Sequence, residues 1–220
     1  MKKIAVILSG CGVYDGTEIH EACAALLALR REGALVVACA PSGPQMQVVD
    51  HLRGQPAEGM PRDILAESAR LVRGDILPLA EVRAADIDGV LLPGGFGAAK
   101  NLSTFATEGA DCRVHPEVEA FLRAAHALGK PIVAMCIAPV ILARVFGQGG
   151  RPRLTIGTDA GTAKMVEALG ARHVACEPAG IVVDEEAKLV TTPAYMGTDD
   201  IGVVFDSAAA AVKKLLTWVP

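Results

Sequence analysis

The chain has 220 residues, of which 51% are apolar and 21% charged, and its formal net charge at pH 7 is −4. No cluster of lysine and arginine stands out, which argues against a nucleic-acid or anionic-membrane partner. The most apolar stretch, 132–143, is shorter than the roughly 18 to 20 residues that a membrane-spanning helix needs. We therefore expect a small-molecule role for one α/β domain over residues 1–220.

The amino terminus and the cysteines bear on the compartment. Two lysines precede an apolar run that ends at Ser9 and Gly10, too soon for a secretory signal peptide. The six cysteines are scattered without the close pairs of a zinc site or a disulfide framework, which indicates a reducing compartment. These features predict a cytoplasmic protein that needs no metal ion or other cofactor.

Short apolar runs alternate with amphipathic segments, an order typical of a parallel sheet with helices on both faces. The predicted strands are 4–8, 35–40, 89–92, 132–135 and 154–156. The predicted helices are 17–31, 63–72, 116–128, a segment directly after Cys136, 160–169 and 200–218. In the first helix, apolar side chains recur at helical spacing at Ile19, Cys23, Leu26 and Leu27. A β-hairpin is expected to pair 181–183 with 189–191.

The most informative segment is 131–140, in which a buried strand ends at Cys136 and a helix begins at once. Ala134 and Ala138 are the small neighbours that a nucleophile elbow requires, although such turns usually carry glycine there. A thiol at the start of a helix meets unpaired N–H groups and the positive end of the helix dipole. We therefore expect the pKa of Cys136 to fall below the usual value of about 8.5. The alternative is a structural cysteine at a buried strand-helix junction.

Two further loops follow predicted strands, whose carboxyl ends meet at one edge of a parallel sheet. Gly94 and Gly95 end one such strand, and their N–H groups, with that of Ile137, can bind a developing oxyanion. A plain tight turn is the alternative for the two glycines. Glu18 opens the first helix and can reach the region of Cys136. Its alternative role is only to complement the helix dipole.

Long segments at 10–21, 93–103 and 135–139 resemble the glyoxalase ElbB family, also called the enhancing-lycopene-biosynthesis proteins. The resemblance continues through 154–159 and 191–196 and so covers nearly the whole chain. The family belongs to the PfpI-like, class I glutamine amidotransferase-like superfamily. The resemblance implies an α/β, flavodoxin-like three-layer sandwich with a mostly parallel central sheet and a small β-hairpin addition.

The resemblance also implies a homodimer and particular site residues. In the superfamily the elbow cysteine pairs with a glutamate of the first helix, and these match Cys136 and Glu18. PfpI-type peptidases have a histidine directly after the nucleophile, whereas this chain has Ile137. Glutamine amidotransferases use a His-Pro-Glu sequence downstream of the cysteine, whereas the one at 115–117 lies upstream. Neither peptidase nor amidotransferase activity is therefore expected.

The resemblance implies a glutathione-independent glyoxalase that converts glyoxal and methylglyoxal to hydroxy acids. In this hypothesis the Cys136 thiolate adds to an aldehyde to give a hemithioacetal, and Glu18 moves protons between the adjacent carbons. A second hypothesis is a redox or electrophile sensor in which Cys11 resolves an oxidised Cys136. A third is an accessory protein of isoprenoid metabolism with little catalysis.

Overall fold

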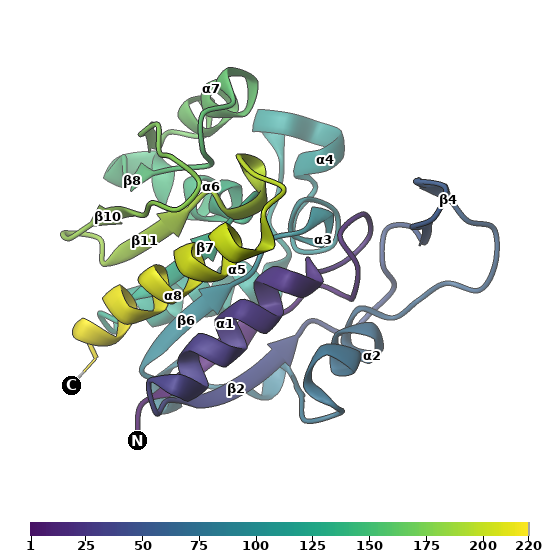
Figure 1. Ribbon diagram of the computed structural model, residues 1–220, viewed down its shortest axis with the longest axis horizontal. Coiled ribbons are helices and arrows are strands. Elements are labelled where there is room, and N and C mark those ends of the chain that lie inside the picture. Colours follow the sequence, from purple (N-terminus) through teal and green to yellow (C-terminus); the bar gives the residue numbers. More distant parts are fainter. Residues whose placement is uncertain (220) are drawn as a thin grey trace.

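Seven strands from along the whole chain form one central sheet in the order β10-β11-β7-β6-β1-β2-β5 (Figure 1). The computed structural model describes residues 1–219. All neighbouring strands run parallel except β10 and β11, which form an antiparallel hairpin at one edge. The strands are β1 (Lys3–Ile7), β2 (Leu35–Ala40), β5 (Leu77–Pro78), β6 (Gly89–Leu92), β7 (Ile132–Met135), β10 (Val182–Asp184) and β11 (Leu189–Thr192).

Helices cover both faces of the sheet, which makes the three-layer, flavodoxin-like sandwich that the resemblance implies. Side chains alternate along β1, so that Ile4 and Val6 enter the core under α1 and α8, and Ala5 and Ile7 the core under α5 and α6. The helices are α1 (Ile19–Arg31), α2 (Ile64–Ser68), α3 (Phe96–Lys100), α4 (Phe105–Glu108), α5 (Pro116–Ala127), α6 (Pro139–Gly150), α7 (Ala160–Ala168) and α8 (Ile201–Thr217). Within residues 1–219, none of the helices combines the length and hydropathy of a membrane span.

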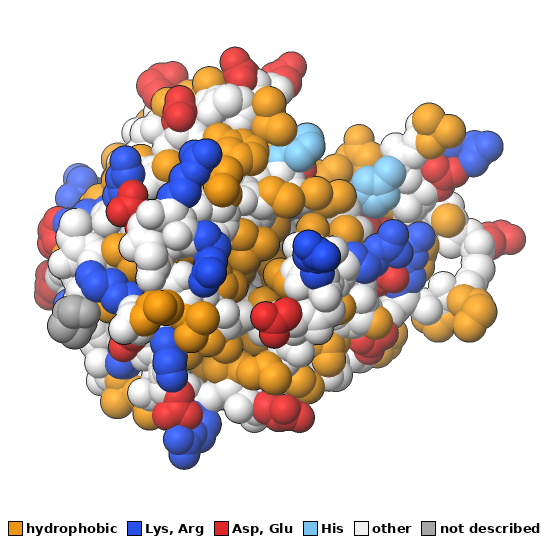
Figure 2. All heavy atoms as spheres, turned by 60° about the horizontal axis from the view of Figure 1, so that its bottom comes forward, with side chains coloured by type: hydrophobic (Ala, Val, Ile, Leu, Met, Phe, Trp, Pro, Cys, Tyr) orange, Lys and Arg blue, Asp and Glu red, His pale blue; other side chains and the backbone are white. Residues whose placement is uncertain are grey.

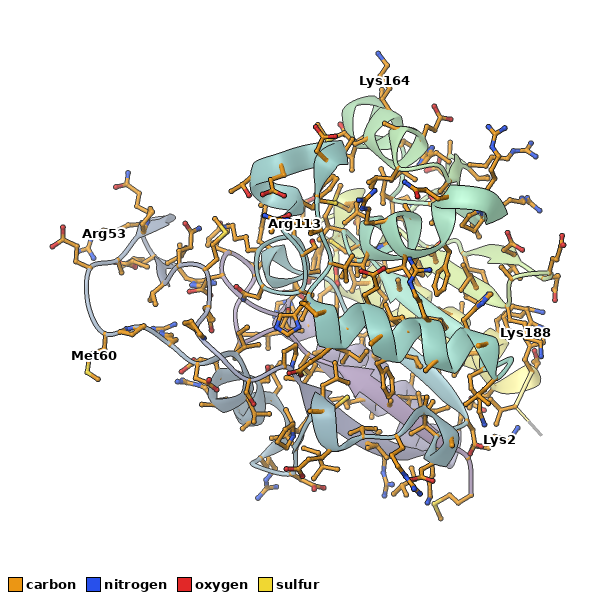
Figure 3. All side chains as sticks on the ribbon, turned by 180° about the vertical axis from the view of Figure 1, so that it is seen from behind. Lys2, Arg53, Met60, Arg113, Lys164 and Lys188 are labelled. Carbon is orange, nitrogen blue, oxygen red and sulfur yellow. The ribbon has the colours of Figure 1, made fainter. Side chains whose placement is uncertain are left out.

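An arm formed by residues 41–62 stands away from the body of the molecule (Figures 1 and 2). It carries a two-stranded antiparallel hairpin, β3 (Val49–Asp50) and β4 (Gln55–Pro56). The backbone N–H of Val49 donates to the buried carboxylate of Asp15 at 2.7 Å, which ties the arm to the loop after β1. Arg53 and Met60 lie on the arm (Figure 3), and Met60 is 88% exposed. The sequence patterns predict no element in this segment.

Two predicted elements are shorter than expected. The helix expected over 63–72 is α2, capped by Asp63, followed by the 3₁₀ turn η1 (Ala69–Val72). The strand expected over 154–156 is β8 (Arg153–Leu154), which pairs in parallel with β9 (Arg172–His173) outside the main sheet. The predicted hairpin is present as β10 and β11.

α1 buries a face that carries alanines and Leu29, whereas Ile19 and Leu27 of the predicted apolar spacing lie outside. Ile19 and Leu27 are 41% and 39% exposed, whereas Glu21, Ala22 and Ala25 are fully buried. α1 lies beside α8 on the sheet (Figure 1), and small side chains on its inner face allow that close approach. This rotation of the helix turns Glu21 toward the carboxyl ends of the strands.

Candidate active site

Cys136 occupies the turn between β7 and α6, at the carboxyl edge of the sheet. Its φ of 57° lies in the left-handed region, which residues other than glycine seldom adopt. Two backbone hydrogen bonds hold the turn: Cys136 N–H to the Thr192 carbonyl at 2.9 Å, and Ala138 N–H to the Met135 carbonyl at 2.9 Å. The side chain is only 8% exposed. This backbone geometry is that of the expected nucleophile elbow.

The carboxyl group that contacts the thiol belongs to Glu21, in the first turn of α1. Glu21 is fully buried, its Oε2 and the Cys136 Cβ both lie beside Gly94, and the two side chains influence each other's pKa. Its Oε2 accepts a hydrogen bond from the Gly94 N–H at 2.8 Å, and its Oε1 accepts one from the Tyr195 N–H at 3.4 Å. The sequence argument missed Glu21. The available signal was the alanine face of α1, because Glu21 lies one turn before Ala25 on that face.

Glu18 is the N-cap of α1, and its carboxylate points back to the helix. Its Oε2 accepts a hydrogen bond from the Glu21 N–H at 2.7 Å, and its Oε1 lies 3.8 Å from His20 Nδ1. This is the structural role that the sequence left open for it, since an N-cap oxygen satisfies a free N–H of the first turn. The expected pairing of Glu18 with Cys136 is therefore corrected: the phase of α1 presents Glu21 to the thiol instead.

Of the expected oxyanion donors, Gly95 and Ile137 are brought together at the sulfur. Both residues line the same cavity as Cys136, and their backbone N–H groups lower the pKa of its thiol. The N–H of Gly94 is turned to Glu21, so Gly94 positions the carboxyl group rather than binding an oxyanion. A Cβ at position 94 would lie 2.5 Å from the Cys136 Cβ, so the close approach of the two strands requires glycine.

Burial is the main cause of the raised pKa values of Glu21 and Cys136. Burial, and after it the negative charge of Glu18, raise the pKa of Glu21 to about 8. Burial also raises the pKa of Cys136 well above its ordinary range, and the charge of Glu21 adds to this effect. The expected fall in the thiol pKa is wrong, because desolvation outweighs the N–H groups of Gly95 and Ile137. At neutral pH both groups keep their protons, and they titrate as a coupled pair.

The thiol faces an apolar cavity of about 410 Å³. The apolar side chains that line it include Val13, Phe96, Phe105, Ile137 and Met196. Lys100 and Thr162 are the polar side chains of the lining besides Cys136, and Lys100 Nζ donates to the Tyr14 carbonyl at 2.7 Å. The cavity brings the Cys136 thiol together with Gly95 and Ile137, whereas the fully buried Glu21 is not part of the lining.

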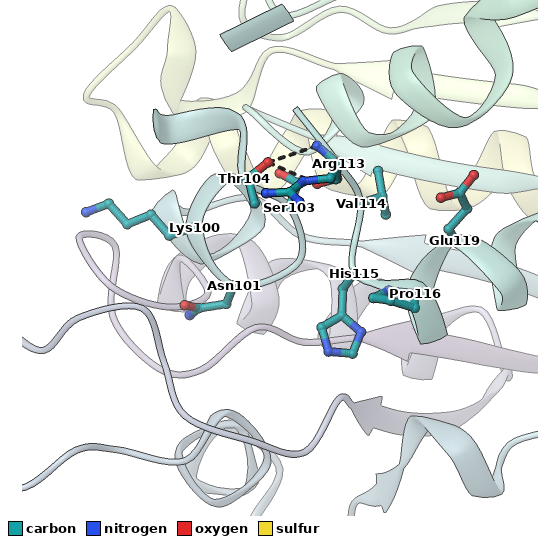
Figure 4. A pocket seen from close by; sticks show the side chains of 9 residues that line it. All are labelled: Lys100, Asn101, Ser103, Thr104, Arg113, Val114, His115, Pro116 and Glu119. Carbon is teal, nitrogen blue, oxygen red and sulfur yellow. Dashed lines mark hydrogen bonds between the residues drawn. The ribbon is translucent and has the colours of Figure 1, made fainter. Parts of the chain in front are cut away.

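A second cavity, of about 500 Å³, has a more polar lining (Figure 4). Arg113 and Thr104 lie on one side of it and His115 on the other, and Arg113 pairs with Glu108 at 2.8 Å. Pro116 begins α5 directly after His115. The His-Pro-Glu sequence thus starts a helix beside this second cavity rather than supplying a histidine to Cys136.

The remaining cysteines and acidic groups add no second reactive centre to the site. All six cysteines are free thiols. Cys11 is half-buried in the loop after β1, where burial raises the pKa of its thiol, and its role as a resolving thiol for Cys136 stays a prediction. In the described part of the chain, residues 1–219, His, Cys, Asp and Glu side chains form no cluster suited to a metal ion.

A cysteine on a strand-to-helix elbow of a flavodoxin-like sheet, faced by a buried glutamate of the first helix, characterises the class I glutamine amidotransferase-like α/β proteins. The DJ-1/PfpI family model matches residues 2–198. The chain therefore belongs to the DJ-1/PfpI family.

Relatives and solved structures agree with this assignment. The chain is 50% identical over 223 aligned positions to the human "Glutamine amidotransferase-like class 1 domain-containing protein 3, mitochondrial", covering 97% of this chain and 82% of that protein. It is 35% identical to the zebrafish "ES1 protein, mitochondrial", covering 97% and 84%. The crystal structure of an Ehrlichia chaffeensis "isoprenoid biosynthesis protein with amidotransferase-like domain" superposes with a TM-score of 0.93 at 32% identity, over 99% of both chains.

The expected cytoplasmic location is wrong in the light of these relatives. The human, rat and zebrafish proteins are all named as mitochondrial. The expectation rested on the absence of secretory features and on cysteines typical of a reducing compartment. Neither property separates the cytosol from the mitochondrion.

Proposed function

We propose that this protein is a glyoxalase-type enzyme that converts glyoxal and methylglyoxal to hydroxy acids without glutathione. The observation that carries the proposal is the contact between the Cys136 thiol and the buried carboxyl group of Glu21, with two N–H donors at the sulfur. Family membership supports it, because the DJ-1/PfpI superfamily includes glyoxalases as well as proteases. The sequence resemblance to the ElbB glyoxalases points in the same direction.

The first step is addition of Cys136 to the aldehyde. Glu21 in its ionised form takes the thiol proton, and a pKa of about 8 suits a general base that works near neutral pH. A C–S bond forms as the carbonyl π bond breaks, and the new alkoxide takes the thiol proton from Glu21, which gives a hemithioacetal and leaves Glu21 ionised again. The N–H groups of Gly95 and Ile137 lie close enough to the sulfur to stabilise the negative oxygen as it develops.

The second step moves hydrogen between the two former carbonyl carbons. Glu21 removes the proton from the carbon bound to sulfur and returns a proton to the neighbouring carbon through an enediol. The first carbon is oxidised to a thioester and the second is reduced to an alcohol, so no external oxidant is required. Water then hydrolyses the thioester, releasing the hydroxy acid and restoring the thiol. In this scheme Glu18 is a positioning residue that caps α1 and keeps the pKa of Glu21 high.

The test is consumption of glyoxal and methylglyoxal without glutathione, with the hydroxy acid measured as product. Cys136→Ser should abolish turnover, and Glu21→Gln should lower kcat by at least about a hundredfold because it removes the base. Glu18→Gln should cost less than about tenfold, since the group does not touch the sulfur. Cys23→Ser, at an exposed position, is the control and should match the wild type. Turnover that survives Cys136→Ser would contradict the proposal.

The sensor hypothesis remains a prediction, which mass spectrometry of Cys136 after mild peroxide treatment tests: a stable sulfinate with negligible dicarbonyl turnover would favour it. An accessory role in isoprenoid biosynthesis is a second candidate function, because the Ehrlichia protein is named as an isoprenoid biosynthesis protein. An inert Cys136 and no dicarbonyl turnover would favour that role.

A further inference from the structure

We propose that the preferred substrate of this site is an α-oxoaldehyde whose substituent is apolar and much larger than methyl, such as a phenyl ring or an alkyl chain of similar size. The α-oxoaldehyde group of this substrate rests on the proposed function. The size and apolar character of its substituent rest on the size and lining of the cavity.

The first observation is the size of the cavity beside the sulfur. It encloses about 410 Å³, within the range of roughly 300 to 1,000 Å³ typical of small-molecule sites. At roughly 30 Å³ per water molecule this space holds on the order of ten waters. Methylglyoxal has only a methyl group beyond its two carbonyl carbons, so it would leave most of this volume to water.

The second observation is the lining. Walls from separate parts of the chain converge on the cavity: Val13 after β1, Phe96 in α3, Phe105 in α4, and Met196 in the 3₁₀ turn η5 (Ala194–Met196). Ile137, directly after the nucleophile, adds a further apolar side chain. A glyoxal molecule has no apolar group to place against such walls.

The third observation concerns the polar side chains of the lining. Lys100 Nζ already donates to the Tyr14 carbonyl and lies 5.1 Å from the centre of the Phe96 ring. Thr162 lies in the first turn of α7, where its N–H donates to Asp159. Apart from Cys136, these two are the polar side chains of an otherwise apolar lining, so most of the cavity wall favours carbon.

Phe96 shows what a substituent would gain. Its side chain is 47% exposed although it lines the cavity, so a ligand would cover apolar surface that now faces water. Each additional buried CH₂ group favours binding by about fourfold. A phenyl ring in place of a methyl group should therefore raise kcat/KM by at least about tenfold if binding energy from the substituent is used in the transition state.

The test compares phenylglyoxal with methylglyoxal, measuring mandelate and lactate because phenylglyoxal also modifies arginine. The wild type should prefer phenylglyoxal by at least about tenfold in kcat/KM. Phe96→Ala removes a wall, and Ala106→Phe fills the cavity from an exposed lining position. Each variant should reduce the preference several-fold. Leu128→Ala, which removes an exposed apolar side chain at the end of α5, is the control and should keep the wild-type preference.

A second readout does not depend on turnover. Iodoacetamide and its N-phenyl derivative are compared as alkylating agents of Cys136 by intact mass, each normalised to its rate with free glutathione. The N-phenyl reagent should react at least about tenfold faster with Cys136, and Phe96→Ala should reduce that advantage. Equal normalised rates, or a preference for methylglyoxal, would overturn the inference. A strong N-phenyl advantage with no turnover of either dicarbonyl would overturn the proposed function and leave the apolar-ligand site standing.

Discussion

Glu21, in the first turn of α1, lies beside the thiol of Cys136, and its charge raises the pKa of that buried thiol. The backbone of β6 completes the arrangement, because the Gly94 N–H fixes one oxygen of the carboxyl group at 2.8 Å. Elements from distant parts of the sequence thus surround the Cys136 thiol and the Glu21 carboxyl group. The chemistry proposed for the site depends on which of these two groups holds the proton.

Glu21→Gln should make the free energy of unfolding less dependent on pH between the unfolded and folded pKa values of Glu21. The folded pKa of Glu21, about 8, lies above its unfolded value of about 4.3, so the folded chain holds more protons between these pH values. The stabilisation is complete below about pH 4.3 and declines by roughly 1 kcal/mol per pH unit up to about 8. The free energy of unfolding in urea, measured across this range, should fall more steeply for the wild type than for Glu21→Gln. Parallel curves would mean that Glu21 is not buried with a raised pKa.

Glu18→Ala should have separable effects on stability and on protonation. Loss of the N-cap should lower the free energy of unfolding by about 1 kcal/mol. Loss of the Glu18 charge should lower the pKa of Glu21, because that charge helps to raise it. The midpoint of Cys136 alkylation should then move to lower pH. Glu18→Asp keeps both the cap and the charge and serves as the control, with a midpoint close to that of the wild type.

Gly94→Ala should damage the site far more than an ordinary glycine substitution. The new Cβ would lie 2.5 Å from the Cys136 Cβ and 2.7 Å from Glu21 Oε2, so the elbow or the carboxyl group must shift. We expect a loss of about 1 to 3 kcal/mol in unfolding free energy and loss of alkylation specific to Cys136. Gly150→Ala is the matched control, since a Cβ there meets nothing within 4 Å. A Gly94→Ala variant with full stability and normal thiol reactivity would show that the close approach is unimportant.

The fold and the nucleophile could be predicted from the sequence because both depend on local patterns. The apolar run over 132–135 identifies the strand β7, and the small residues Ala134 and Ala138 identify the turn at Cys136. The hairpin at 182–192 follows from two apolar runs around an acidic turn. The arm at 41–62 has no such pattern, and it is held by a tertiary contact with the buried Asp15.

The partner of the nucleophile could not be predicted in the same way. Large apolar side chains usually mark the buried face of a helix, but in α1 Ile19 and Leu27 are on the outside and alanines pack inward. The choice between Glu18 and Glu21 depends on that rotation, which tertiary packing decides. The direction of the Cys136 pKa shift likewise depends on how deeply the elbow is buried. The homodimer remains a prediction, for which sedimentation velocity is the appropriate measurement.

The pH dependence of Cys136 alkylation by iodoacetamide, in the wild type and in Glu21→Gln, tests the central claim most directly. If Glu21 is the base for the thiol, the wild-type rate should rise with a midpoint near about 8, where Glu21 loses its proton. The Glu21→Gln rate at that pH should be at least about tenfold lower, because burial still raises the thiol pKa and no base remains. A thiol that titrates well below this pH, with the same profile in both proteins, would contradict the account.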